Sequence, residues 1–332
     1  MPSSISVVIP SYNRRDYLRE TLAALRAQTR PADEVIVVDD GSSDGTVEML
    51  AAEHPDIRCL PIANSGDLAA RNVGVRAAAG DLVAFCDSDD LWLPEHLAEV
   101  AALFEEAPAV GTVCANFHTF TGGRVAAEDK FAHAPPGWFD GAREVGPGRL
   151  VVEEPWVRRV VAFNPFFPSA MAMRRAWFLG LGGWDEGVGR TVGTDFATSM
   201  RLAEHPPIGF VRRPTVRIRK HESNYSGDLV KMNLGDATIL EYCLATRPQL
   251  APLRAEIEAS VRRRRLSALG VAFAQRDLAT VRAIRAQLGA GPLPKAAAMK
   301  AAVAALPGPL GGMVAGALLA LGSARARLTG RG

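Results

Sequence analysis

The sequence predicts an α/β protein with a mostly parallel sheet flanked by helices, followed by an all-helical C-terminal region. Short apolar runs alternate with helical segments over roughly the first hundred residues, a spacing typical of parallel sheets covered on both faces. After about residue 226 the strand pattern disappears, and Ala, Leu and Arg dominate. We therefore expect an α/β domain over residues 1–225 and a helical region over residues 226–332.

Four predicted strands, each followed by a predicted helix, make up the first part of the chain. The strands are expected within residues 6–9, 34–38, 57–62 and 81–90, and the helices within 17–28, 42–53, 66–80 and 93–107. Leu18, Leu22 and Leu25 recur at helical spacing, and a serine or aspartate is expected to cap the second helix. Pro94 stands early in the fourth helix, where proline is tolerated.

Residues 110–226 are less regular. We expect strands at 110–120 and 168–175, and a loop at 182–194 that leads into a helix. The glycine-rich segment from Gly122 to Gly148 is expected to be mostly loop, and a long loop in a compact enzyme is often a lid or a specificity element. Farther on, two helices are expected to meet in a turn at Arg276-Asp277, and a last helix to start at Pro309.

Composition and charge indicate an ordinary globular protein whose two parts differ in surface charge. The net charge is +2, but 15 Lys/Arg face 6 Asp/Glu from Ser226 onward, which leaves the first part acidic. The four cysteines form no paired or metal-binding pattern, so we expect reduced thiols. Because the N-terminal residues do not resemble a signal peptide, we expect a cytoplasmic protein.

Two of the predicted strands end in acidic clusters, Asp39-Asp40 and Asp87-Ser88-Asp89-Asp90. Ligands of open α/β sheets bind beyond the carboxyl ends of the strands, so both clusters should lie at one sheet edge with Tyr12. Crowded carboxylates need a cation or hydrogen-bond donors, and an Asp-x-Asp pair suits Mg²⁺ or Mn²⁺ bound to phosphate oxygens. The alternative is that these acids cap the helices that follow.

Three segments carry a resemblance to a known family. They are VVIPSYNRRDYLRETLAALRAQT with EVIVVDDGSSDGT, then ARNVGVRAAAGDLVAFCDSDDLWLPEHL, and then GGWDEGVGRTVGTDF. In this order and spacing they resemble the family 2 glycosyltransferases over roughly residues 4–226. The resemblance implies the Rossmann-like GT-A fold and sugar transfer from a nucleotide sugar, most commonly a UDP-sugar, with dTDP and GDP donors left open.

The resemblance also implies site residues. Those expected around the nucleotide are Pro10 and Tyr12 against the base, Asp40 accepting a hydrogen bond from it, Arg71 beside the base and facing the diphosphate, and Asp87 near the ribose. Asp89 would ligate Mn²⁺ or Mg²⁺, and His221 would reach the metal or the diphosphate. Asp195 would be the general base.

The chemistry that this set implies is a single displacement with inversion. A sugar hydroxyl is a poor nucleophile and needs a carboxylate to take its proton, while a metal stabilises the departing diphosphate. Each residue also has an ordinary interpretation: Asp195 as a helix cap, His221 as a solvated side chain and Arg71 as a surface residue. Thr194 stands where the family usually has Glu, and Ala197 and Ser199 also depart from its pattern.

The sequence bears on two other functions. A sugar-nucleotide pyrophosphorylase would need a glycine-rich phosphate loop after the first strand, and PSYNRRDYL has no glycine. A degenerate nucleotide-sugar binder without transferase activity is the remaining alternative, and Thr194 motivates it. The acceptor is expected to be a hydroxyl of a saccharide, a lipid-linked molecule or a small molecule; no nucleic-acid partner is expected.

The last predicted helix suggests peripheral contact with the inner face of the cell membrane. Ala301–Ala324 contains no charged residue, and Leu310, Met313, Val314, Leu318 and Leu321 are expected on one face of this helix. Pro307 and Pro309 interrupt the segment and argue against a transmembrane span. The alternative is that this face packs on the catalytic domain.

Overall fold

The computed structural model describes residues 3–189, 191–221 and 228–328. The described chain forms two compact units. The first contains everything up to residue 189 together with residues 194–221, and the second contains residues 191–193 and the chain from residue 228 onward.

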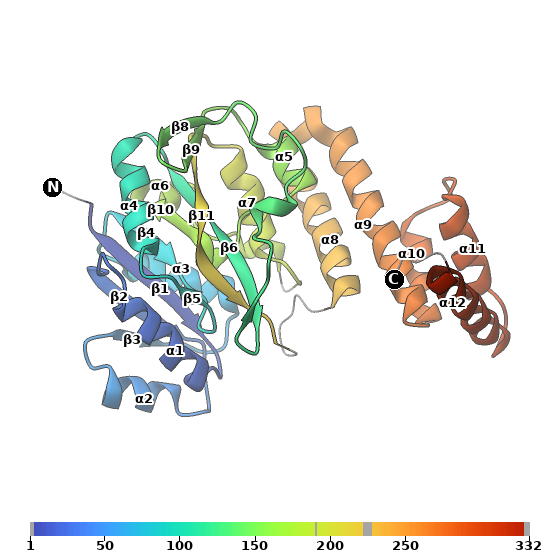
Figure 1. The fold of residues 1–332 in the computed structure, drawn as a ribbon, viewed down its shortest axis with the longest axis horizontal. Helices are drawn as coiled ribbons and strands as arrows, with labels where there is room; N and C mark the ends of the chain where they lie inside the picture. Colours follow the sequence, from blue (N-terminus) through green and yellow to red (C-terminus); the bar gives the residue numbers. More distant parts are fainter. Residues whose placement is uncertain (1–2, 190, 222–227, 329–332) are drawn as a thin grey trace. The chain divides into compact units, whose positions relative to one another are not determined.

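A single mixed sheet is the centre of the first unit (Figure 1). Its strands are β1 (Ile5–Ser11), β2 (Glu34–Asp39), β3 (Arg58–Pro61), β4 (Leu82–Phe85), β5 (Leu91–Trp92), β6 (Thr112–Thr121), β7 (Arg124–Val125), β8 (Arg143–Gly146), β9 (Arg149–Val152), β10 (Met171–Arg174) and β11 (Ile208–Arg219). The order is β3-β2-β1-β4-β10-β6-β11-β9-β8, with β5 against β11 and β7 against β6. This mixed, mostly parallel sheet confirms the predicted fold class.

Strands β3, β2, β1 and β4 run parallel, so their carboxyl ends lie at one edge. β1 is buried along its whole length, as its continuous run of Ile and Val predicts. Pro10 is accommodated within this central strand because β4 pairs with β1 only as far as Val8, so no hydrogen bond to β4 is lost there. β10 then runs antiparallel to β4 and β6.

Helices flank the sheet. They are α1 (Arg15–Arg26), α2 (Thr46–Glu53), α3 (Asp67–Ala77), α4 (His96–Glu106), α5 (Val157–Ala162), α6 (Arg175–Gly180) and α7 (Asp195–Ala203), with short 3₁₀ turns at Phe131–His133, Pro168–Ala170 and Glu186–Val188. Glycine at position 74 lets α3 pack closely on β1, because a Cβ there would lie 2.3 Å from the Val8 side chain. This contact holds the second half of α3 against β1.

The sheet differs from the sequence-based expectation in its second half. β11 was not predicted, and the segment expected to be mostly loop contains β7, a 3₁₀ turn and β8, which pairs with β9 as a hairpin. These strands are short or irregular in pattern, and β11 carries a register shift around Pro214. β11 pairs with the distant strands β6 and β9, whereas β7 and β8 form short local hairpins with β6 and β9.

The second unit is helical, as expected. It contains α8 (Leu229–Thr246), a 3₁₀ segment at Pro248–Leu253, α9 (Arg254–Ala274), α10 (Leu278–Gln287), α11 (Lys295–Ala304) and α12 (Leu310–Leu328). Its core gathers side chains from all five helices, among them Leu269, Phe273, Ile284 and Ala304. Among the described residues, no helix is long and apolar enough to cross a membrane.

Candidate active site

The loops after β1 and β2 are joined at the sheet edge. The Asn13 side chain accepts a hydrogen bond from the backbone N–H of Ser43 (2.8 Å), and the Asn13 N–H donates to Ser42 Oγ (2.9 Å). Asn13 has a φ of 51°, which places the loop in a sharp turn. Tyr12, just before this turn, is half exposed, whereas Pro10 is buried in β1. Tyr12 is therefore free to contact a ligand at this edge.

The two aspartates at the end of β2 have different surroundings. Asp40 is buried, and its carboxylate accepts hydrogen bonds from the backbone N–H groups of Ser65 (2.6 Å) and Gly66 (2.9 Å). It thereby fastens the loop that begins α3. Asp39 Oδ2 accepts from the Ser42 N–H, but its buried Oδ1 has no partner among the described residues. Sequence reasoning assigned Asp40 and missed this feature of Asp39.

Arg71 is buried and bridges two carboxylates. Its guanidinium lies 2.6 Å from Asp67 Oδ2 and 2.6 Å from Asp87 Oδ1, with its Cζ 5.2 Å from the centre of the Trp184 ring. Burial lowers the pKa of Arg71, but Asp87 and Asp67 outweigh this effect and raise it, so the guanidinium stays charged. Burial raises the pKa of Asp87, and Arg71 opposes that rise. The surface interpretation of Arg71 is therefore wrong.

Asp89 and His221 lie in direct contact, from the end of β4 and just beyond β11. His221 Nε2 is 2.9 Å from Asp89 Oδ2, and both side chains are largely buried. The His221 ring stacks on Tyr17 of α1, with ring centres 5.3 Å apart and planes within 13°. The interpretation of His221 as a solvated side chain is therefore wrong, and the two predicted metal ligands are side by side.

A third carboxylate, Asp90, connects the pieces of this edge. It is buried and accepts hydrogen bonds from Ser169 Oγ (2.5 Å) and from the backbone N–H of Arg219 (2.8 Å). Ser169 Oγ also accepts from the Asp87 N–H (2.8 Å), and the Arg219 side chain donates to the Asp89 carbonyl (2.7 Å). Burial, with the nearby charges of Asp89 and Asp87, raises the pKa of Asp90 well above its usual range.

Sequence reasoning gave Asp90, Ser169 and Arg219 no role. The sequence did contain a signal for Asp90, because it is the third acidic residue of its cluster. Nothing local indicates Ser169 or Arg219, because their partners are far away in the chain.

Asp195 opens α7, which a short loop ties to α3. The Asn72 side chain, next to Arg71, donates to the Trp184 carbonyl (2.9 Å) and accepts from the Trp184 N–H (2.8 Å). The Asp185 N–H then donates to Thr198 Oγ1 in α7 (3.0 Å). Position 183 must be glycine, because its φ is 69° and a Cβ would lie 2.5 Å from Asn72 Oδ1. The helix that carries Asp195 is thus linked to the helix that carries Arg71.

A family model matches the first part of the chain. Residues 6–153 match the family model described as glycosyl transferase family 2. This part of the chain is therefore similar to the family 2 glycosyltransferases.

Two curated relatives illustrate this similarity. A putative teichuronic acid biosynthesis glycosyltransferase, TuaG of Bacillus subtilis, is 39% identical over 140 residues, which are 40% of this chain and 53% of the relative. An uncharacterized glycosyltransferase of Nostoc sp., alr2836, is 38% identical over 113 residues, which are 33% of this chain and 35% of the relative. The chain thus spans about a third to a half of the length of these relatives.

Two solved structures share the fold at low sequence identity. S. aureus TarS 1-349 in complex with UDP-GlcNAc matches with a TM-score of 0.53 and 22% identity, over 73% of this chain and 66% of TarS 1-349. The mannosyltransferase PcManGT from Pyrobaculum calidifontis, in complex with GDP-Man and Mn²⁺, matches with a TM-score of 0.52 and 21% identity, over 99% of this chain and 88% of that protein.

The pair Asp89–His221 fits one divalent ion. Adjacent ligands of an octahedral ion with bonds of about 2.1 Å lie roughly 3 Å apart, close to the 2.9 Å between Asp89 Oδ2 and His221 Nε2. Carboxylate and imidazole suit Mn²⁺ better than Mg²⁺, which prefers oxygen alone. Within the described residues, no group of three or more His, Cys, Asp or Glu side chains forms a metal site, so diphosphate oxygens and water would complete this one.

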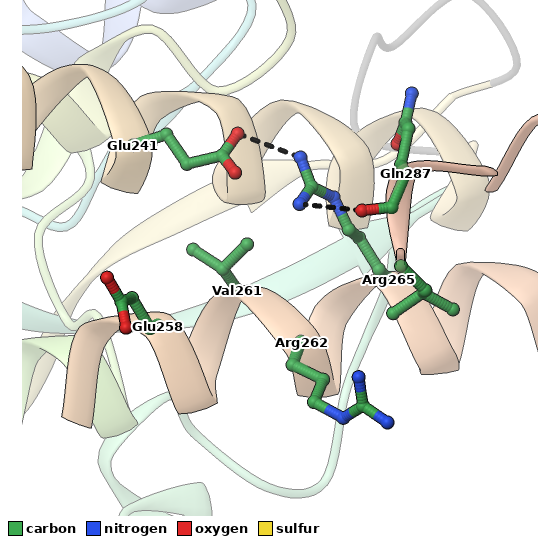
Figure 2. Close-up of a pocket in the computed structure, with 7 residues that line it drawn as sticks. Glu241, Glu258, Val261, Arg262, Arg265 and Gln287 are labelled. Carbon is green, nitrogen blue, oxygen red and sulfur yellow. Dashed lines mark hydrogen bonds and ion pairs between the residues drawn. The ribbon is translucent and has the colours of Figure 1, made fainter. Parts of the chain in front are cut away.

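A separate cavity of about 270 Å³ lies in the second unit, between α8, α9 and α10 (Figure 2). It is lined by Glu241, Glu258, Val261, Arg262, Arg265, Gln287 and Leu288. Arg265 donates to Glu241 (2.8 Å) and to the Gln287 carbonyl, so its guanidinium joins α8 to α10 (Figure 2). The charges of this cavity largely compensate one another, and we assign it a structural role.

Proposed function

We propose that this chain is an inverting, metal-dependent glycosyltransferase that moves a sugar from a nucleoside diphosphate sugar, a UDP-sugar first of all, to a hydroxyl acceptor. The observation that carries the proposal is the contact between Asp89 and His221, beside the buried Arg71–Asp87 pair at the strand ends. The family of the domain and the donor complexes named for TarS and PcManGT support it.

In this proposal each residue of the edge has one task. Tyr12 contacts the base, with the buried Pro10 beneath this edge. Asp40 was expected to accept a hydrogen bond from the base, but both of its oxygens hold the loop, so Asp39 offers the oxygen that has no partner among the described residues. Arg71 keeps Asp87 charged and in place for the ribose. Asp89 and His221 would hold Mn²⁺ or Mg²⁺, which neutralises charge on the departing diphosphate when bound.

Asp195 is the proposed general base. It would accept the proton of the acceptor hydroxyl as oxygen attacks the anomeric carbon from the face opposite the diphosphate, so the configuration inverts. The degenerate-binder alternative rests on the departures around Asp195. However, Ala197 and Ser199 are fully buried in α7, so these two departures change the packing of α7 rather than an exposed acceptor surface. Thr194 alone remains as a difference beside the base.

The acceptor is proposed to be a hydroxyl of a saccharide, a lipid-linked molecule or a small molecule. The proposed location is the cytoplasm, with peripheral contact at the inner face of the cell membrane through the C-terminal helices.

The deciding experiment is a donor screen. The purified full chain is incubated with UDP-, GDP- and dTDP-sugars, with Mn²⁺ or with a chelator, and release of the nucleoside diphosphate is measured. We expect release from one donor class that depends on the metal, and faster release when a hydroxyl acceptor is added. Binding of a nucleotide sugar without turnover under any condition would favour the degenerate binder.

A further inference from the structure

The exposed apolar side chains of this protein are concentrated near its C-terminal end. Of the nine large hydrophobic residues exposed in the described chain, six lie between residues 299 and 321. Four of these form a stripe on α12: Leu310, Met313, Val314 and Leu321, which are 48%, 60%, 37% and 67% exposed. Their spacing along the helix puts them on one side, which we call the α12 outer face.

The opposite side of α12 already packs within the second unit. Ala315 is fully buried there, and Leu318 and Leu319 are half-buried against the same core. Leu318 was predicted on the same face as the four exposed residues, but it is half-buried against this core. A Cβ at Gly311 would approach the Leu278 side chain and the Val303 carbonyl to 3.0 Å, so small residues let α12 lie close to its neighbours.

As far as Ala324, helix α12 is therefore apolar on both sides, but only one side is covered by the rest of the unit. Residues 301–324 contain no charged side chain. Helices of soluble proteins that are apolar all round are normally buried, and contiguous exposed apolar surface marks a site of contact with a protein or a membrane. The outer face thus has a stable environment only when something apolar covers it.

The charge of the chain around this helix indicates whether a protein or a membrane covers the outer face. From Leu278 to the end the chain has seven Lys or Arg residues and no Asp or Glu. A second copy docked on the same surface would bring two such cationic segments together, and like charges across an interface oppose association. An anionic lipid surface instead complements them, and apolar insertion combined with basic attraction is the pair of signals that peripheral membrane binding requires.

We infer that the α12 outer face docks in the plane of an anionic membrane, with Leu310, Met313, Val314 and Leu321 inserted among the lipids. Lys295, exposed at the start of α11, would lie among the cations that face the headgroups. This mode needs no transmembrane span, in agreement with the lack of a spanning helix in the described part of the chain. It does not depend on the proposed sugar transfer.

The test uses the full chain and two double variants with the same chemical change. Met313→Glu/Leu321→Glu alters the outer face, and Val125→Glu/Leu229→Glu alters two apolar side chains that are exposed elsewhere. Each protein is sedimented with vesicles of phosphatidylcholine alone or with added phosphatidylglycerol, at low and high salt. Circular dichroism and thermal unfolding check that the variants keep the fold.

We expect the wild type and the control variant to bind only the anionic vesicles, less so at high salt, and the outer-face variant to bind at least about tenfold more weakly. Equal binding by all three proteins, or by none, would overturn the inference. Light scattering provides a second readout: a wild-type dimer that becomes monomeric in the outer-face variant, without vesicle binding, would assign this face to a second copy.

Discussion

His221 and Asp89 are 132 residues apart in the chain, yet His221 Nε2 lies 2.9 Å from Asp89 Oδ2. The contact forms because Asp89 follows the end of β4 and His221 follows the end of β11, and both strands end near the same place. A divalent ion bound to both side chains would replace the contact that joins them here. The first predictions below test this pair and the residues that hold it.

Asp89→Asn should abolish Mn²⁺-dependent turnover of the donor while preserving the fold. The amide keeps the size of the side chain but offers the ion no negative charge. Turnover is measured over a Mn²⁺ titration, with thermal unfolding as the control for folding. An Asp89→Asn protein with wild-type activity would remove Asp89 from the metal site.

Asp90→Ala should weaken Mn²⁺ binding about 10–100-fold, the range seen when groups that orient a metal ligand are removed. The substitution removes the carboxylate that accepts from the Arg219 N–H and the Ser169 hydroxyl. The end of β11, which leads to His221, is then held less firmly at the site. Binding is measured by electron paramagnetic resonance of free Mn²⁺, without donor. Asp16→Ala, at an exposed position, is the matched control, and unchanged affinity in Asp90→Ala would contradict the positioning role.

Asp195→Asn should leave donor affinity within a few-fold of wild type and slow transfer by roughly 10²–10⁴-fold, the usual contribution of a general base. The amide cannot take a proton from the acceptor at neutral pH. Donor affinity is measured by calorimetry, and transfer in single turnovers. Glu204→Gln, at the other end of α7, serves as control. Normal transfer in Asp195→Asn, or loss of donor binding alone, would contradict the assignment.

Arg71→Met should lower the free energy of unfolding by about 3 kcal/mol, because it leaves the Asp87 carboxylate without its buried partner. Arg71→Lys restores one charge but not both contacts, so an intermediate loss is expected. Arg26→Met removes an exposed pair with Asp56 and should cost less than about 1 kcal/mol. Urea unfolding measures all three, and equal losses in Arg71→Met and Arg26→Met would refute the buried bridge.

Stability should fall in acid partly through Glu34. Burial opposes ionisation of this side chain, but hydrogen bonds from Ser6 and Ala79 and the nearby Arg58 outweigh it, so the pKa of Glu34 is lowered. The stabilisation is therefore present above the unfolded-state pKa, about 4.3, and is lost as the pH falls through the lower folded-state value. Glu34→Gln should cost about 1 kcal/mol at neutral pH and nearly nothing near pH 3, as followed by urea unfolding. A cost that does not change with pH would rule this linkage out.

The amino-acid sequence by itself determined the α/β class, the first four strands with their helices, and the helical C-terminal region. These elements follow from local periodicity: buried runs such as Ser6–Ile9 and the helical spacing of Leu18, Leu22 and Leu25 need no distant partner to be recognised. The acidic clusters at the strand ends were visible for the same reason, since each follows directly on its own strand.

Only the tertiary structure decided how these groups act together. β9 and β11 are strands because distant segments pair with them, and the contacts of Asp90 with Ser169 and Arg219 join positions 79 and 129 residues apart. For Arg71 and His221 the sequence left a surface position open as an alternative, and only the fold shows them buried between carboxylates and an aromatic ring. Burial and charge pairing depend on which segments meet in space, and no local pattern records that.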